Sequence, residues 1–133
     1  MKKIEHIGIA VTDLNEANAL YTKILGLKPY KIEKVNSEEV ITSFFQTNST
    51  KIELIQGVGE NNAISNFIKK RGEGIHHIAF EVEDIKAEIS RLKKLGFDII
   101  NEIPKKGADN KLICFIHPKS TKHVLIELCQ EIK

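Results

Sequence analysis

Apolar and polar residues alternate along residues 4–11, close to the start of the chain. Ile7, Ile9 and Val11 fall on one face of this stretch, and the residues between them fall on the other. An alternation with a period of two predicts a β-strand with one buried face. Residues 77–82 repeat the alternation, so the sequence predicts a second strand of the same kind.

A helical pattern follows each of these two strands. Apolar residues recur every three or four positions over 14–25 and again over 85–95. Asp13 and Asp84 stand where an N-cap residue is expected, and Gly26 follows the first run as a C-terminal cap. The spacing therefore predicts two helices, each entered directly from a strand.

Three shorter strand-like runs follow each predicted helix, so that the plan β-α-β-β-β occurs twice. The runs lie at 27–33, 39–46 and 50–56 in the first half, and at 97–102, 111–117 and 122–129 in the second. Repetition of a whole plan is a stronger signal than the propensity of any one segment. The expected fold class is α+β, with two tandem β-α-β-β-β modules forming a cupped mixed sheet.

The two modules fill a chain of 133 residues, a length that suits one compact domain, 1–133. Module one covers about residues 1–56, and module two covers about 75–133. The connector, 57–74, contains a short helical segment. No shift in composition argues for a second domain.

Charge and composition argue against several classes of protein. The net charge is only +2 and the lysines are scattered, unlike the basic stripe of a nucleic-acid binder. No window is apolar for long enough to span a membrane, and no Walker, dinucleotide-binding or nucleophile-elbow motif occurs. Cys114 and Cys129 lack metal or redox spacing, so we expect buried free thiols in a cytoplasmic protein.

Each half carries one histidine on its first strand and one glutamate on its last. His6 and His77 begin the two matching strands, and Glu53 and Glu127 lie in matching Ile-Glu-Leu segments. A lone histidine or glutamate is more often structural, but pairs at equivalent positions support each other, and buried carboxylates without a cation are costly. Imidazole and carboxylate ligands suit Zn, Co, Ni, Mn or Fe(II) alike, so the repeat predicts a divalent-metal site.

The doubled plan with these four residues resembles the vicinal oxygen chelate superfamily, which includes the glyoxalases. Within it, three stretches look like methylmalonyl-CoA epimerase: residues 71–80, 117–120 and 124–128. The resemblance covers almost the whole chain. It implies the cupped fold and an isomerase activity.

The resemblance also implies roles for particular side chains. The implied metal ligands are His6, Glu53, His77 and Glu127, with Co, Zn, Ni, Mn and Mg not distinguished. Glu127 would be both ligand and acid/base. Some relatives carry a second catalytic glutamate on the strand before Glu53, where this chain has Thr42. We therefore expect Glu53 itself to act as the second acid/base.

The implied reaction interconverts the two C2 epimers of methylmalonyl-CoA through an enolate. Lys119 and Ser120 are the expected contacts of this thioester substrate, and the implied assembly is a homodimer that binds neither nucleic acid nor membrane. Two alternatives stay open. One is glyoxalase I, a lyase with the same four ligands that acts on a methylglyoxal–thiol hemithioacetal. The other is a non-catalytic resistance-type binding protein, a class that generally lacks these ligands.

Overall fold

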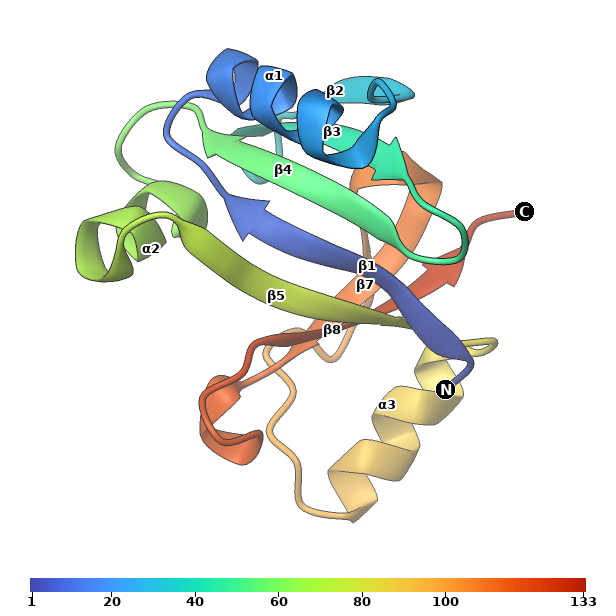
Figure 1. Ribbon diagram of the computed structural model, residues 1–133. Helices are drawn as coiled ribbons and strands as arrows, with labels where there is room; N and C mark the ends of the chain where they lie inside the picture. Colours follow the sequence, from blue (N-terminus) through green and yellow to red (C-terminus); the bar gives the residue numbers. More distant parts are fainter. The chain divides into compact units, whose positions relative to one another are not determined.

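The computed structural model describes all residues from Met1 to Lys133. The chain divides into two compact units, described separately below. The first unit is His6–His76, and the second unit is Met1–Glu5 together with His77–Lys133. Each contains one β-α-β-β-β module, as predicted (Figure 1). No helix is both long enough and apolar enough to cross a membrane.

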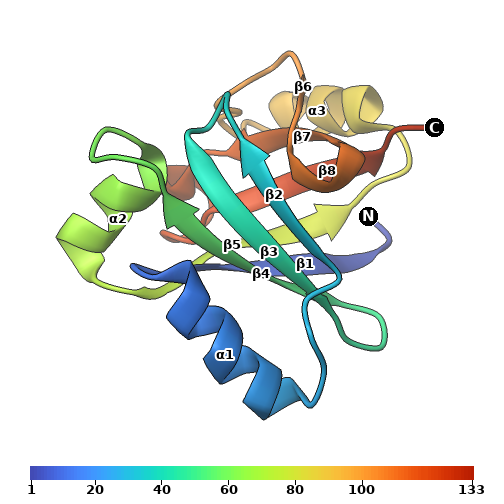
Figure 2. The ribbon, with the colours of Figure 1, turned by 90° about the horizontal axis from the view of Figure 1, so that it is seen from above.

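The module of the first unit is a four-stranded mixed sheet with one helix against it. Its elements are β1 (Lys3–Ala10) from His6 onward, α1 (Leu14–Leu25), β2 (Lys31–Val35), β3 (Val40–Gln46) and β4 (Lys51–Gly57). The strand order is β2-β3-β4-β1. β1 runs parallel to β4, whereas β2 and β3 lie side by side as an antiparallel pair (Figure 2). The alternation predicted for β1 therefore places its side chains on the two faces of this sheet.

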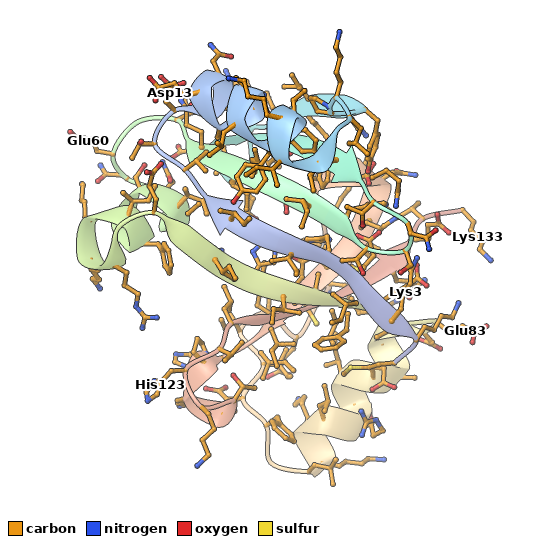
Figure 3. The ribbon with its side chains drawn as sticks, viewed as in Figure 1. Lys3, Asp13, Glu60, Glu83, His123 and Lys133 are labelled. Carbon is orange, nitrogen blue, oxygen red and sulfur yellow. The ribbon has the colours of Figure 1, made fainter.

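Helix α1 covers one of these faces, and its ends are set by local chemistry. The Asp13 side chain (labelled in Figure 3) accepts a hydrogen bond from the Glu16 backbone N–H, and Gly26 takes the left-handed conformation at φ 71°. The apolar stripe that begins at Leu14 packs on Phe45 and Leu54, which are fully buried. Burial of each such side chain contributes about 1.5–3 kcal/mol. The predicted bounds of this helix are confirmed.

A second helix, α2 (Ala63–Arg71), follows β4 and confirms the helical segment predicted in the connector. Asn62 caps it by accepting a hydrogen bond from Ser65 N at 2.8 Å. The end of β4 lies directly under this cap, because a Cβ atom at Gly57 would collide with the Ser65 hydroxyl and the Asn62 side chain. Glycine at position 57 therefore permits the close approach of α2 to β4.

The second unit repeats the plan of the first. Its elements are β5 (Gly74–Glu81), α3 (Ile85–Lys94), β6 (Lys105–Lys106), β7 (Lys111–Ile116) and β8 (Ile126–Glu131), with short 3-10 turns at Ala108–Asn110 and Pro118–Ser120. The strand order is β5-β8-β7-β6, and β5 runs parallel to β8. Asp84 caps α3 through Ala87 N, and the apolar face of α3 packs on Leu128 and Cys114.

The prediction of a strand at 97–102 is wrong. Only an isolated bridge, Ile99 to Ile116, forms there, and the edge strand of this sheet is the two-residue β6 instead. The Asn101 side chain explains the difference, because it accepts from Phe115 N and donates to the Ile113 carbonyl. A side-chain amide thus satisfies backbone groups of β7 that a longer neighbouring strand would have paired.

Two other predicted strands begin later than expected. β8 starts at Ile126 rather than at residue 122, because Lys122 and His123 (the latter labelled in Figure 3) have φ values of 57° and 71° and complete a turn. β2 starts at Lys31 rather than at residue 27. Pro29, which lacks a backbone N–H, precedes it and cannot donate to a strand ladder.

Candidate functional site

His6 and Glu53 meet on the face of the first unit's sheet that α1 does not cover. β1 and β4 run parallel with Gly8 opposite Glu53, so the two side chains project from the same face. His6 Nε2 lies 3.3 Å from Glu53 Oε1, and the two side chains are only 6% and 7% exposed. Gly8, which stands opposite Glu53 on β1, has no side chain and so leaves room for this contact.

His77 and Glu127 form the same contact in the second unit. β5 and β8 run parallel with Ala79 opposite Glu127, and His77 Nε2 lies 3.2 Å from Glu127 Oε1. The side chains are 5% and 6% exposed. Two repeats with matching histidine and Ile-Glu-Leu positions therefore build the same buried imidazole–carboxylate pair.

A phenylalanine holds each imidazole ring edge-on. The Phe44 ring lies 6.4 Å from the His6 ring at 86°, and the Phe115 ring lies 6.0 Å from the His77 ring at 89°. In the strand ladders Phe44 stands opposite Glu53, and Phe115 stands opposite Glu127. These two aromatic residues belong to the site and were missed from the sequence. The matching Phe-then-Glu order on neighbouring strands of both halves could have revealed them.

Each carboxylate-bearing strand is also tied to the start of its helix. The Gln56 side chain accepts a hydrogen bond from Leu14 N at 2.7 Å, and the Gln130 side chain accepts one from Ile85 N at 2.7 Å. Each glutamine follows its glutamate by three residues, on the opposite face of the strand. The helix entry and the carboxylate are therefore fixed by one strand, which restricts how far the glutamate can shift.

The donor set of each pair fits a divalent cation. Metal–nitrogen and metal–oxygen bonds of about 2.0–2.2 Å place neighbouring ligand atoms about 2.8–3.6 Å apart in octahedral or tetrahedral geometry. The contacts of 3.3 Å in the first unit and 3.2 Å in the second lie within that interval. Buried carboxylates also need a compensating positive charge. Each pair therefore supplies one nitrogen and one oxygen ligand suited to such an ion.

Thr42 lies on the same face of the first unit's sheet as His6 and Glu53. It is 1% exposed, and its hydroxyl has no hydrogen-bond partner. On the neighbouring strands it stands opposite Ile55 and Glu33. A neutral hydroxyl is no general base at ordinary pH, so the expectation that Thr42 cannot exchange protons agrees with its chemistry.

Lys119 and Ser120 lie in the exposed turn after β7. Lys119 Nζ lies 3.0 Å from Asp98 Oδ2, and the Ser120 hydroxyl accepts a hydrogen bond from Asp98 N at 3.1 Å. His117 closes the same turn by accepting from Lys119 N. Both predicted substrate contacts, Lys119 and Ser120, therefore bind Asp98 in this structure.

The two cysteines are free and buried, as predicted. Burial raises the pKa of the Cys114 thiol to about 12. Burial, and after it the negative charge of Glu127, raises the pKa of Cys129 as well. Both thiols are protonated at neutral pH and poor nucleophiles, which argues against thiol-based catalysis.

Comparisons with known proteins are consistent with this reading of the repeat. Residues 5–115 match the family model of the Glyoxalase/Bleomycin resistance protein/Dioxygenase superfamily. The chain belongs to this superfamily. The expected fold class is confirmed, and the similar proteins of this superfamily include methylmalonyl-CoA epimerases.

Similar members of the superfamily include an uncharacterised protein and two epimerases. The uncharacterised protein YqjC of Bacillus subtilis is 37% identical over 98% of this chain and 93% of its own length. The ethylmalonyl-CoA/methylmalonyl-CoA epimerase of Cereibacter sphaeroides is 39% identical over 96% of this chain and 97% of its own length. A solved methylmalonyl-CoA epimerase in complex with methylmalonyl-CoA and ammonium has a TM-score of 0.95 at 28% identity, over 98% of this chain and 95% of that one.

Proposed function

We propose that this protein is a divalent-metal-dependent epimerase that interconverts the two C2 epimers of methylmalonyl-CoA. The observation that carries the proposal is the duplicated buried contact, His6 with Glu53 and His77 with Glu127, at 3.3 Å and 3.2 Å. Similarity to epimerases over nearly the whole chain supports the choice of substrate.

The reaction needs help because the C2 hydrogen of the substrate is only weakly acidic. It lies between a thioester and a carboxylate, and its removal leaves negative charge on their oxygen atoms. A divalent ion held by His6, Glu53, His77 and Glu127 would act as a Lewis acid that stabilises this charge. The histidines, kept edge-on by Phe44 and Phe115, would hold their ring nitrogens in one orientation.

Inversion at C2 requires one group to remove a proton and another to deliver one to the opposite face. We assign these roles to Glu127 and Glu53, the two buried carboxylates that the repeat places at equivalent positions. Glu53 takes the second role because the hydroxyl of Thr42 is unsuited to it.

Lys119 and Ser120 would contact the CoA portion of the substrate. The Lys119 side chain is 67% exposed, so its ion pair with Asp98 is weak and can be exchanged for a phosphate. The homodimer and the cytoplasmic location stay predictions.

Turnover of one methylmalonyl-CoA epimer tests the proposal. Protein stripped of metal is expected to be inactive, and Co²⁺ or another divalent ion should restore conversion together with deuterium uptake from solvent at C2. Glu53→Gln and Glu127→Gln should each reduce turnover by 100-fold or more, in line with the about 10²–10⁴-fold contribution of general acid–base groups. Glu131→Gln, on the same strand as Glu127 but with a side chain 65% exposed, is the matched control.

Three results would contradict the assignment. Full turnover in Glu53→Gln would remove Glu53 from the acid/base pair. Absence of conversion with every metal would remove the epimerase activity, and the methylglyoxal hemithioacetal assay would then test glyoxalase I. If the protein binds no metal, the remaining alternative is the resistance-type binding function.

A further inference from the structure

Thr42 is a buried polar side chain whose hydroxyl the fold leaves without a partner. The residue is 1% exposed and its hydroxyl makes no hydrogen bond. Its neighbour Ser43 shows the contrast, because the Ser43 hydroxyl donates to the Asn18 side chain on α1. The strand therefore satisfies the hydroxyl that faces the helix and leaves the one on the other face unused.

The position of Thr42 relative to Glu53 follows from the strand ladder. Phe44 stands opposite Glu53, and Thr42 stands opposite Ile55, one step further along the same face. Two residues along a strand cover about 7 Å. A small molecule held beside the Glu53 carboxylate would therefore lie within reach of the Thr42 hydroxyl.

An unsatisfied buried hydroxyl is disfavoured in a free protein, since it has lost its hydrogen bonds to water and gained none in return. Valine has nearly the same shape and would avoid this loss. Local violations of such rules are expected where a binding partner supplies the missing bond. The missing partner here is a hydrogen-bond acceptor, or a donor, brought by a ligand on the His6–Glu53 face.

We infer that the Thr42 hydroxyl donates a hydrogen bond to an oxygen atom of the substrate's acyl group, and so positions it beside Glu53. The inference rests on the proposed function for the identity of that group, which in a malonyl-type thioester carries carboxylate and thioester oxygens. Thr42 binds substrate and transfers no proton. It also selects for acyl groups that place an oxygen at this point, because an analogue without one leaves the hydroxyl unpaired.

Three variants test the inference. Thr42→Val keeps the shape and removes the hydroxyl, Thr42→Ser keeps the hydroxyl, and Ser43→Ala is the matched control on the opposite face of β3. We expect Thr42→Val to raise KM for methylmalonyl-CoA about five- to tenfold, which corresponds to one hydrogen bond, while Co²⁺ affinity by calorimetry stays unchanged. Thr42→Ser should keep KM within about twofold of the original protein.

The thermal midpoint supplies an independent readout. Thr42→Val should leave it equal or raise it by a few degrees, because a disfavoured buried group is removed, whereas Ser43→Ala should lower it and leave KM unchanged. A lower midpoint with an unchanged KM in Thr42→Val would overturn the inference and make the hydroxyl structural.

The outcome can be separated from failure of the proposed function. If the original protein does not turn over methylmalonyl-CoA, the Co²⁺-loaded protein is titrated with malonate. Weaker malonate binding by Thr42→Val than by Thr42→Ser would keep Thr42 as an oxygen-binding residue for another acyl substrate. Equal binding by the two variants would overturn it.

Discussion

Removal of the divalent ion proposed for His6, Glu53, His77 and Glu127 should lower the thermal stability of this protein by a large and calculable amount. Glu53 and Glu127 have side chains that are 7% and 6% exposed, so without a cation each carboxylate is held away from water beside an imidazole. An ion at about 1,000 times its dissociation constant stabilises the folded state by about 4 kcal/mol. For a chain of 133 residues, the entropy of unfolding is such that 1 kcal/mol of stabilisation raises the thermal midpoint by about 3.6 °C. Saturating metal should therefore raise the midpoint by about 15 °C.

Differential scanning calorimetry of chelator-treated protein, before and after Co²⁺ is added, measures this shift. Glu127→Gln and His77→Ala should each lose most of it, whereas Glu131→Gln, with its exposed side chain, should keep it. Glu53→Gln and His6→Ala should behave like their counterparts, because the repeat gives both pairs the same contact. A midpoint that does not respond to any divalent ion would refute the reasoning. So would a shift that survives the loss of either histidine.

Further predictions concern the scaffold. Gln56→Leu and Gln130→Leu each leave a helix-entry N–H without its 2.7 Å partner, so urea titration should show similar losses of about 1–3 kcal/mol for the two variants. Gly57→Ala should lower the free energy of unfolding by 2 kcal/mol or more, because the new methyl group meets the Ser65 hydroxyl and the Asn62 side chain. The thiols of Cys114 and Cys129 should resist Ellman's reagent in the native protein and react fully in denaturant, because burial raises both pKa values. Since the unfolded chain loses these protons first, stability should fall as the pH rises above about 9.

The parts of the fold that the sequence predicts well are those set by local chemistry. Asp13 and Gly26 define the ends of α1 because a side-chain oxygen and a left-handed glycine satisfy the terminal backbone groups. The alternation of β1 assigns its faces correctly, since Ile9 packs with the helix and His6 with Glu53. In such segments the pattern and the backbone bonding agree.

The errors occur where a side chain or a turn replaces a backbone ladder. The stretch 97–102 has the composition of a strand, but the Asn101 amide takes the place of strand pairing to β7. The turn before β8 depends on positive φ values at Lys122 and His123, residues that give little sign of this conformation in sequence. Such features depend on tertiary contacts that a pattern of apolar residues does not encode.

The repeat predicts the His–Glu pairs because both modules contain one. It says little about the substrate, because a repeat shows only what the two modules share. In the ladders Phe44 corresponds to Phe115 and Glu53 to Glu127, each phenylalanine opposite its glutamate. Thr42, two residues before Phe44, corresponds to Ile113. The repeat is broken there, since a hydroxyl stands in one module and an alkyl chain in the other. A metal ion can be bound by equivalent ligands, but a substrate whose carboxylate, thioester and methyl groups differ needs contacts that differ. The residues that define the substrate should therefore be sought where the two modules differ, and Thr42 is the first of them.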